Sequence, residues 1–522
     1  MTPNRFRRSL LRNACASVAL CAAAGTLFMP ISALAAPAKG GTANLAMAGE
    51  ILSLDPMLTS SILSATITQH IYEPLFTFDS KWNLAPMLAE ALPNISKDGR
   101  VYTIALRHGV KFHNGKEMKS DDVVASLKRW MEMAPRGKTL ATELNSIEAK
   151  GPYTVVFSLK RPYAPLLAQL ALPSGLAGIM PKEVIANPLK EYIGTGPYKF
   201  KERKPDQYLL LVRFDDYSAR KEPADGYAGK REALLDELRF VPVPNANTRV
   251  EGALSGQYQF ADLLPVEAYK RLENKPNVTP IITPQYGYPY LVLNTKQGVM
   301  ANLGVRQAFQ DALSDTEMMT AAYGDKRFFN LEANHYPKGS PFYSTAGAEH
   351  YNQGNAKKAA AELAAAKYNG APIRLLTSQQ YDFHYRIALV MAENLKQAGF
   401  KVDLQVVDWA TLLQRRNDPA LWDVYVTHAT FLPEPMLLPP QLGNDAPGWW
   451  QTPAKEAALT AFNTETDPVK RGALWAQVQS VVYTEVPYMR LGNFNTLTAK
   501  SSNLEGYMPS EWPSFWNVSL KR

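Results

Sequence analysis

Cysteine is almost absent from the sequence. Of the 522 residues only Cys15 and Cys21 are cysteines, and both fall within the first 35. The chain beyond residue 35 can therefore form no disulfide, bind no metal through thiolates and use no cysteine nucleophile. Its stability must come from the burial of apolar side chains, for which a content of 46% hydrophobic residues provides ample material.

Long apolar runs and clustered charge are also lacking. No stretch after residue 35 is apolar over the length that a membrane-spanning helix requires. The net charge of +8 is dilute for a chain of this length, and no Lys/Arg run is present, so the sequence gives no indication of nucleic-acid binding. The length predicts two or more domains with separate cores.

Catalytic and metal-binding motifs are missing as well. The segment 252–256 fails to match G-x-S-x-G by one position, and the seven histidines are scattered without an H-E-x-x-H motif. We therefore predict no metal site, no cofactor and no enzymatic activity. A Ser-His-Asp triad is not excluded by residue order, so an exported peptide hydrolase is kept as the alternative of another class.

The N-terminal segment has the three parts of a secretory signal peptide. Four arginines, at positions 5, 7, 8 and 12, precede an apolar stretch over residues 14–29, and Ala33-Leu34-Ala35 matches an A-x-A cleavage site. We predict that residues 1–35 are a signal peptide, cleaved near Ala35, and that the mature protein is periplasmic. The alternative, a membrane anchor, is disfavoured because the stretch is short and rich in alanine.

Two export routes are compatible with this segment. Arg7-Arg8 resembles the twin-arginine signal, but Phe6 stands where that signal favours Ser or Thr, so the Sec route stays open. A lipoprotein anchor at Cys21 is rejected, because Leu20 is large where a small residue is expected.

The first third of the chain has a mixed α+β pattern. Residues 101–107 and 154–159 alternate or are β-branched and predict strands. Between them Ser120 is predicted to cap a helix with Asp121 and Asp122 in its first turn, where the helix dipole favours acids.

The C-terminal third has an alternating strand and helix pattern. We predict strands over 372–377, 400–407 and 422–427, with helices over 383–398 and 409–416 between them. Right-handed crossovers then make the three strands parallel. Ligands of such sheets bind at the C-terminal ends of the strands.

Five residues at those strand ends are predicted to bind a ligand: Gln379, Asp408, Trp409, His428 and Glu434. An acid beside an aromatic ring, as in Asp408-Trp409, is the combination that a small-ligand pocket uses. Trp409 could instead begin a helix and pack into the core, and Glu434 could be a structural acid.

Several segments together resemble the dipeptide-, oligopeptide- and nickel-binding proteins of ABC importers, extracellular solute-binding family 5. They are Leu54-Asp55-Pro56, Ile71-Tyr72-Glu73-Pro74-Leu75, the stretch 102–115 with Asp121-Asp122-Val123-Val124 after it, Gly194-Thr195-Gly196-Pro197-Tyr198, Asn294-Thr295 and Val305-Arg306-Gln307-Ala308. Their order matches the family from about Gly40 to the C-terminus.

The resemblance implies an α/β fold of the bilobed periplasmic-binding-protein type (type II, cluster C-like), with an extra α+β domain and a ligand cleft between the lobes. It assigns 36–75, 190–285 and 493–522 to lobe I, 76–189 to the extra domain and 286–492 to lobe II. The strand 288–294 is expected near the hinge, which adds Tyr288 to the predicted ligand site. The implied partners are a small ligand, a peptide or peptide-like solute, and the permease subunits of an ABC importer; we expect a monomer.

The sequence departs from the peptide binders of this family at both charged ligand anchors. Their Gly-Trp-x-x-Asp segment, whose Asp holds the ligand's amino group, corresponds here to residues 427–431, with His428 at the Trp position and Phe431 at the Asp position. The dipeptide binders' Arg for the ligand carboxylate falls near Gln379. A free dipeptide is therefore in doubt, and opine-like, glycosylated or amino-acid-derived compounds or a chelated metal, which His428 could contact, remain alternatives.

Overall fold

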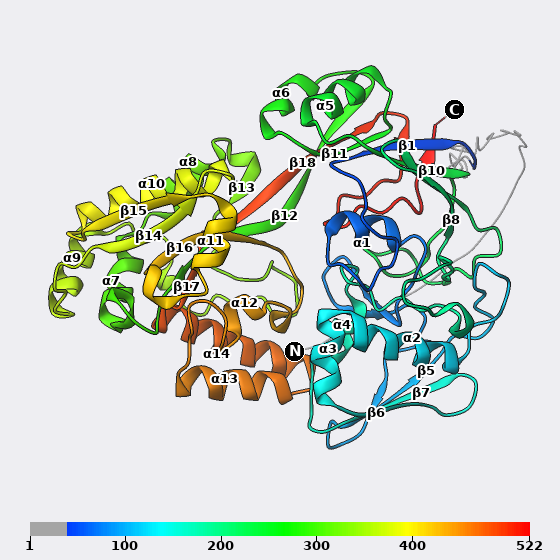
Figure 1. The fold of residues 1–522 in the computed structure, drawn as a ribbon, viewed down its shortest axis with the longest axis horizontal. Coiled ribbons are helices and arrows are strands. Elements are labelled where there is room, and N and C mark those ends of the chain that lie inside the picture. Colours follow the sequence, from blue (N-terminus) through cyan, green and yellow to red (C-terminus); the bar gives the residue numbers. More distant parts are fainter. Residues whose placement is uncertain (1–38, 522) are drawn as a thin grey trace, which may run out of the picture. The chain divides into compact units, whose positions relative to one another are not determined.

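The computed structural model describes residues 39–521, and its largest element is one mixed sheet (Figure 1). Ten strands follow one another across this sheet in the order β15 (Val402–Val407), β14 (Ile373–Ser378), β16 (Val424–Thr430), β12 (Val278–Leu293), β18 (Asn493–Ser501), β11 (Phe260–Leu264), β1 (Thr42–Met47), β10 (Glu237–Pro242), β9 (Tyr208–Arg213) and β8 (Tyr198–Lys204). The short strands β13 (Phe329–Asn330) and β17 (Tyr488–Arg490) pair with β18 and β12.

The strands β12 and β18 join the two halves of this sheet. β12 is 16 residues long and pairs with β18 over residues 278–283. After an irregularity between Thr283 and Gly287, it pairs with β16 over residues 287–293. The predicted strand 288–294 is thus the second half of a longer strand, which changes its main partner within its length.

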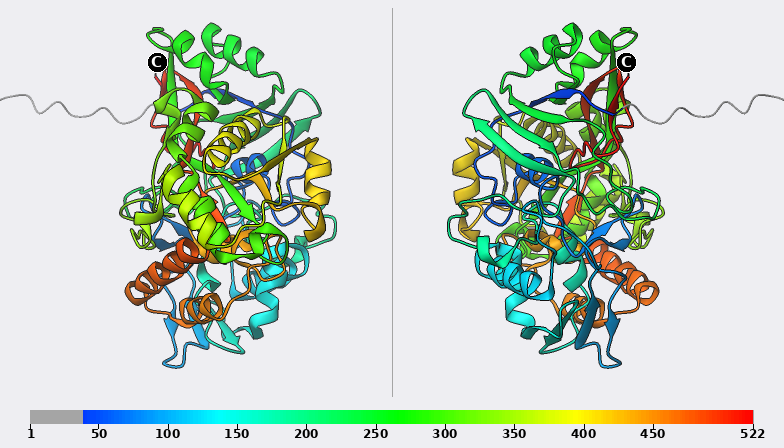
Figure 2. Two further views of the ribbon diagram at one scale, coloured as in Figure 1. Left: turned by 90° about the vertical axis from the view of Figure 1, so that its left-hand side faces the viewer. Right: turned by 90° about the vertical axis from the view of Figure 1, so that its right-hand side faces the viewer.

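The predicted parallel arrangement near the C-terminus is confirmed. β14 pairs in parallel with β15 and with β16, and the helices α10 (Asp382–Gln397) and α11 (Trp409–Arg415) connect them. The central strand β14 is covered on both faces, and its alternate side chains enter different cores. Leu375 belongs to the core under α10, whereas Leu376 belongs to the core under α11. Figure 2 shows the green and yellow helices lying over this part of the sheet.

A separate four-stranded antiparallel sheet lies earlier in the chain, in the order β4 (Asn94–Ile95), β5 (Val101–Ala105), β7 (Thr154–Leu159) and β6 (Leu144–Ala149). The helices α2 (Ser120–Met133), α3 (Pro135–Glu143) and α4 (Leu166–Ala171) belong to the same stretch. The predicted cap is wrong by one residue. Lys119 precedes the helix and its N–H donates to the Asp122 carboxylate, whereas the Ser120 hydroxyl donates to the Gly151 carbonyl.

The remaining elements complete the cores. The other helices are α1 (Ile62–Thr68), α5 (Ala246–Ser255), α6 (Tyr269–Leu272), α7 (Leu303–Ala312), α8 (Asp315–Tyr323), α9 (Ala356–Ala365), α12 (Pro439–Leu442), α13 (Pro453–Thr464) and α14 (Pro468–Glu485). Two short hairpin-like pairs are β2 (Phe76–Phe78) with β3 (Leu84–Pro86), and β19 (Leu504–Glu505) with β20 (Ser519–Leu520). One large hydrophobic cluster draws on residues 43–260 and 504–518, and two others draw on residues 288–491.

Several of the motifs that carry the family resemblance contact one another in the core. Glu73 is fully buried, and its carboxylate accepts hydrogen bonds from Tyr217 (2.6 Å) and from Thr195 of the Gly194-Thr195-Gly196 segment (3.0 Å). The Gly194 amide donates to the His113 Nδ1 atom at 3.3 Å, and the Gly196 amide donates to the Ile71 carbonyl at 2.9 Å. These segments thus form scaffold.

The signal-peptide prediction lies outside the described residues, and the predicted domain boundaries stay predictions. None of the helices within residues 39–521 has both the length and the apolar character that crossing a bilayer demands.

The first testable prediction concerns the close approach at Gly194. A Cβ atom there would lie 2.0 Å from the Ile71 carbonyl oxygen, a backbone atom that cannot move aside. We expect Gly194→Ala to lower the free energy of unfolding by about 3 kcal/mol, at the upper end of overpacking costs. Gly49→Ala is the matched control, since its Cβ would meet only a Leu63 methyl at 4.0 Å. Equal denaturant midpoints for the two variants would contradict the prediction.

Candidate functional site

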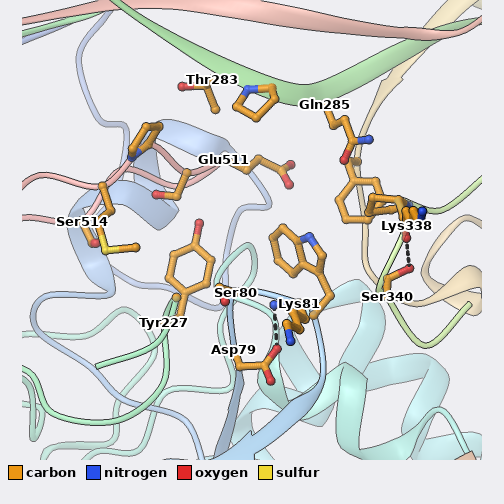
Figure 3. Close-up of a pocket in the computed structure, with 18 residues that line it drawn as sticks. Asp79, Ser80, Lys81, Tyr227, Thr283, Gln285, Lys338, Ser340, Glu511 and Ser514 are labelled. Atoms are coloured by element: carbon orange, nitrogen blue, oxygen red, sulfur yellow. Dashed lines mark hydrogen bonds between the residues drawn. The ribbon is translucent and has the colours of Figure 1, made fainter. Parts of the chain in front are cut away.

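A cavity of about 350 Å³ lies where β12 passes the turn between β2 and β3 (Figure 3). Its wall includes residues of the segments 79–82, 226–227, 283–285, 337–340 and 508–514, together with Phe431 just after β16. The volume falls within the range of about 300–1,000 Å³ that is typical of small-ligand pockets. The cavity is therefore the first candidate for the functional site.

Trp82 forms one wall and contacts aromatic rings of two different hydrophobic clusters. Its ring centroid is 6.2 Å from that of Tyr227, on one side, and 5.2 Å from that of Phe431, on the other. The turn before it is held by Asp79, whose carboxylate accepts hydrogen bonds from the backbone amides of Lys81 and Asn83, both at 2.8 Å. Trp82 has a φ of 65°, a conformation that a bulky residue adopts only when its surroundings fix it.

The side of the cavity formed by β12 coincides with the irregularity in that strand. Gln285 has a φ of 51°, and its backbone amide donates to the side-chain oxygen of Asn495 on β18 (2.9 Å). The Asn495 side-chain amide in turn donates to the Arg327 carbonyl (2.8 Å). The cavity thus lies beside the point at which β12 changes partners, where a small change of strand angle would alter its width.

Glu511 is the one acid buried in the cavity wall. It is 5% exposed, and neither carboxylate oxygen has a hydrogen-bond partner among the described residues. Burial raises the pKa of Glu511 well above the usual range of a glutamate, and Thr430 opposes this rise only in part. Figure 3 shows its carboxyl group reaching between Tyr227 and Gln285.

A second cavity, of about 400 Å³, shares Trp82 with the first. It is mainly apolar, with Phe78, Leu92, Ile95 and Phe342 in its wall. Trp82 therefore stands between a cavity that contains a buried acid and one that can accept an apolar group.

The first two predicted ligand residues lie away from both cavities. Gln379 follows β14 with an exposed side chain. Asp408 is exposed and caps α11: its carboxylate accepts from the Thr411 amide at 2.9 Å and from the Thr411 hydroxyl at 2.5 Å. These hydrogen bonds lower the pKa of Asp408. Asp408 thus has a structural partner, and its predicted contact with a ligand stays a prediction.

Trp409 and His428, by contrast, are brought together. With Tyr381 and His384 they form an aromatic cluster at the ends of β14 and β16, in which the His428 Nδ1 and His384 Nε2 atoms are 3.0 Å apart. Burial lowers the pKa of His428 to about 4 and that of His384 to about 2, so both rings are neutral at pH 7. In residues 39–521 no group of three or more His, Cys, Asp or Glu side chains is arranged to hold a metal ion.

Tyr288 and Glu434 are both buried and both have partners within the chain. The Tyr288 hydroxyl accepts from Gln441 (2.8 Å), and the Arg490 guanidinium lies 3.6 Å from the Tyr288 ring centroid. Glu434 accepts two hydrogen bonds from Arg471, at 2.6 and 2.7 Å, and this pair lines the second cavity. Arg471 thus supplies the cation that a buried glutamate requires.

Sequence reasoning missed most of the cavity wall. Trp82, Tyr227 and Glu511 lie in loops distant in sequence from the predicted strand ends, and no periodic pattern marks them. Phe431 was identified only as the residue at an anchor position of related proteins. The acid–aromatic pair Glu511-Trp512 was a usable signal, since the same kind of pair drew attention to Asp408-Trp409.

Comparison with known proteins places the chain among binding proteins. Residues 83–445 match the family described as bacterial extracellular solute-binding proteins, family 5 Middle. The chain is 28% identical to a probable peptide ABC transporter periplasmic-binding protein, y4tO, of Sinorhizobium fredii, with 95% of this chain and 97% of that protein covered. It is 27% identical to the oligopeptide-binding protein AppA of Bacillus subtilis, with 92% and 91% covered.

Solved structures agree with these relatives. The structure of Bacillus subtilis AppA in complex with a nonapeptide matches with a TM-score of 0.70 and 25% identity, over 93% of this chain and all of that one. The substrate-binding protein CtaP of Listeria monocytogenes matches with a TM-score of 0.79 at 20% identity, a likeness that bears on the fold alone. The predicted bilobed α/β fold of periplasmic binding proteins is confirmed.

The neutral histidine pair predicts sensitivity to acid. Because the pKa values of His384 and His428 in the folded protein lie below the ordinary value of 6.5, the unfolded chain binds more protons below that pH. The free energy of unfolding should therefore fall as the pH drops from about 6.5 towards 4, by up to about 1.4 kcal/mol per pH unit for each histidine. His428→Asn should make this slope shallower in denaturant titrations; an unchanged slope would contradict the prediction.

The Glu434–Arg471 pair predicts a loss of stability in Glu434→Gln. The substitution leaves a buried guanidinium without its counter-charge, so we expect the free energy of unfolding to fall by about 3 kcal/mol. Glu251→Gln is the control, because its partner Arg271 is about as exposed as Glu251 itself and surface pairs contribute less than about 1 kcal/mol. A Glu434→Gln protein with unchanged stability and weakened ligand binding would show instead that the acid is a ligand anchor.

Proposed function

The chain belongs to the bacterial extracellular solute-binding proteins, family 5, and we propose that it is the substrate-binding component of an ABC importer for a peptide or peptide-like solute. The observation that carries the proposal is the cavity beside β12, which combines aromatic walls with one buried acid. Relatives support the proposal, because the chain matches proteins named for peptide transport and oligopeptide binding along almost its whole length.

A non-peptide solute is the second candidate ligand for the same site. A structure of AgaA in complex with agropinic acid shares the fold at 23% identity, which keeps an opine-like or amino-acid-derived ligand as the second candidate. The relatives are binding proteins and not enzymes, so the exported peptide hydrolase has no support from them.

Export and assembly belong to the same proposal. The family consists of extracellular proteins, and we propose that residues 1–35 direct this chain to the periplasm, where it acts as a monomer and delivers its ligand to the permease. Gln379, Asp408, Trp409 and His428 stay the proposed contacts for the part of a ligand that extends towards the ends of β14 and β16. Loss of affinity in Trp409→Ala, with no loss of stability, would support their role.

Ligand binding should stabilise the protein and close it. At a ligand concentration of about one hundred times Kd, binding to the folded state alone adds about 2.7 kcal/mol to the free energy of unfolding. We expect a casein hydrolysate, used as a pool of short peptides, to raise the melting temperature, and mass spectrometry to identify the retained peptides. The bound protein should also have a smaller radius of gyration by X-ray scattering. A melting temperature unaffected by the hydrolysate would overturn the peptide proposal.

A further inference from the structure

Glu511 lies on a loop whose position is fixed from several sides. The backbone of Trp512 donates to the Tyr227 hydroxyl (3.0 Å), and its carbonyl accepts from the Gln69 side chain (3.1 Å). Three residues further on, the Phe515 amide donates to the His70 Nε2 atom (2.9 Å). The loop is closed at its base by the pairing of β19 with β20. The backbone that carries Glu511 is therefore held in place before any ligand arrives.

This carboxyl group lacks the close hydrogen-bond donors that the other buried glutamates have, although Thr430 lowers its pKa in part. Glu73 accepts from Thr195 and Tyr217, and Glu434 accepts two hydrogen bonds from Arg471, whereas both oxygens of Glu511 are buried and unpaired within the described chain. No lysine or arginine contributes to the pKa of Glu511. A buried carboxylate without a donor is strongly unfavourable, so an empty position for a donor is implied beside it.

The groups that face this position identify the kind of donor. The rings of Trp82, Tyr227 and Phe431 line the same cavity, and aromatic faces attract cations. The neighbouring titratable phenols of Tyr227, Tyr286 and Tyr288 are neutral, because burial raises their pKa values. The other charged residues of the wall are Asp79, Lys81 and Lys338; Asp79 has its own backbone partners, and both lysines are exposed.

From this geometry we infer that Glu511 binds the ammonium group of the ligand, which for a peptide is its α-amino group. The inference deepens the proposed function and rests on it. One carboxylate among aromatic rings suits an ammonium, which needs a single strong acceptor and tolerates apolar surroundings. A calcium ion would require six or more oxygen ligands, commonly several carboxylates, whereas no group of three or more His, Cys, Asp or Glu side chains within residues 39–521 is arranged to hold a metal ion.

A change in the protonation of Glu511 accompanies this contact. In the empty protein the raised pKa keeps Glu511 protonated at pH values at which a glutamate is usually ionised. An ammonium group beside it favours the ionised form. Binding of a peptide with a free amino terminus should therefore release a proton from Glu511. Calorimetry in buffers of different ionisation enthalpy measures that proton directly, and affinity should rise with pH until Glu511 is ionised in the empty protein.

The test compares Glu511→Gln with Glu505→Gln, which changes an exposed acid of β19, at the base of the loop and outside the cavity wall. A peptide retained from the casein hydrolysate is synthesised with a free and with an acetylated amino terminus. We expect Glu511→Gln, and separately acetylation, to weaken binding at least about 30-fold, the usual effect of breaking a buried charged pair. The acetylated peptide should bind wild type and Glu511→Gln within about threefold of each other, because the contact is already lost.

Each outcome bears on the inference. Affinity lost only in Glu511→Gln and only for the free peptide, with the proton release abolished, supports it. Equal binding of free and acetylated peptide, or equal affinity of the two variants for the free peptide, overturns the inference and leaves the proposed function intact. Absence of any peptide binding by the wild-type protein overturns both. Thermal melts of the empty variants confirm that each is folded.

Discussion

The pairing of β12 with β18 is the constraint on which the remaining architecture depends. These two strands are the link through which the strands around β14 and those around β1 form one sheet. The irregularity between Thr283 and Gly287 lets β12 leave β18 and pair with β16 without a break in the chain. The Asn495 side chain holds the displaced residue Gln285, so the departure from regular pairing is itself supported by hydrogen bonds.

Much of the fold follows from local patterns, and the site does not. The segment from β14 to β16 could be predicted because its strands are short and apolar and its long helix has a clear apolar stripe. The start of β12 was missed, since residues 278–287 contain two prolines and a glycine, which weaken a strand pattern. The acid–aromatic pair Glu511-Trp512 was the only local signal for Glu511, because the position of this segment depends on distant residues such as Gln69, which lies 443 residues before its partner Trp512.

Buried acids in this protein divide into two kinds. Asp55, Glu73 and Glu434 each contact an arginine or hydroxyl group of the same chain, which fits the view that ionised groups inside a protein are paired. Several of these residues belong to the motifs by which the sequence resembles its relatives, and their role is to hold segments together. The acid in the cavity wall lacks such a partner. The family motifs thus identify the scaffold, whereas the ligand contact inferred for Glu511 lies outside them.

The short pairing of β19 with β20 matters for work with the purified protein. β20 ends at Leu520, two residues before the end of the chain, and the loop it closes carries Glu511 into the cavity wall. An affinity tag fused directly to Arg522, or a truncation that removes Ser519 and Leu520, would strain or release that loop. A tag placed there would change the position of Glu511 and so the ligand affinity, whereas a tag separated from β20 by a flexible glycine–serine spacer would leave both unchanged.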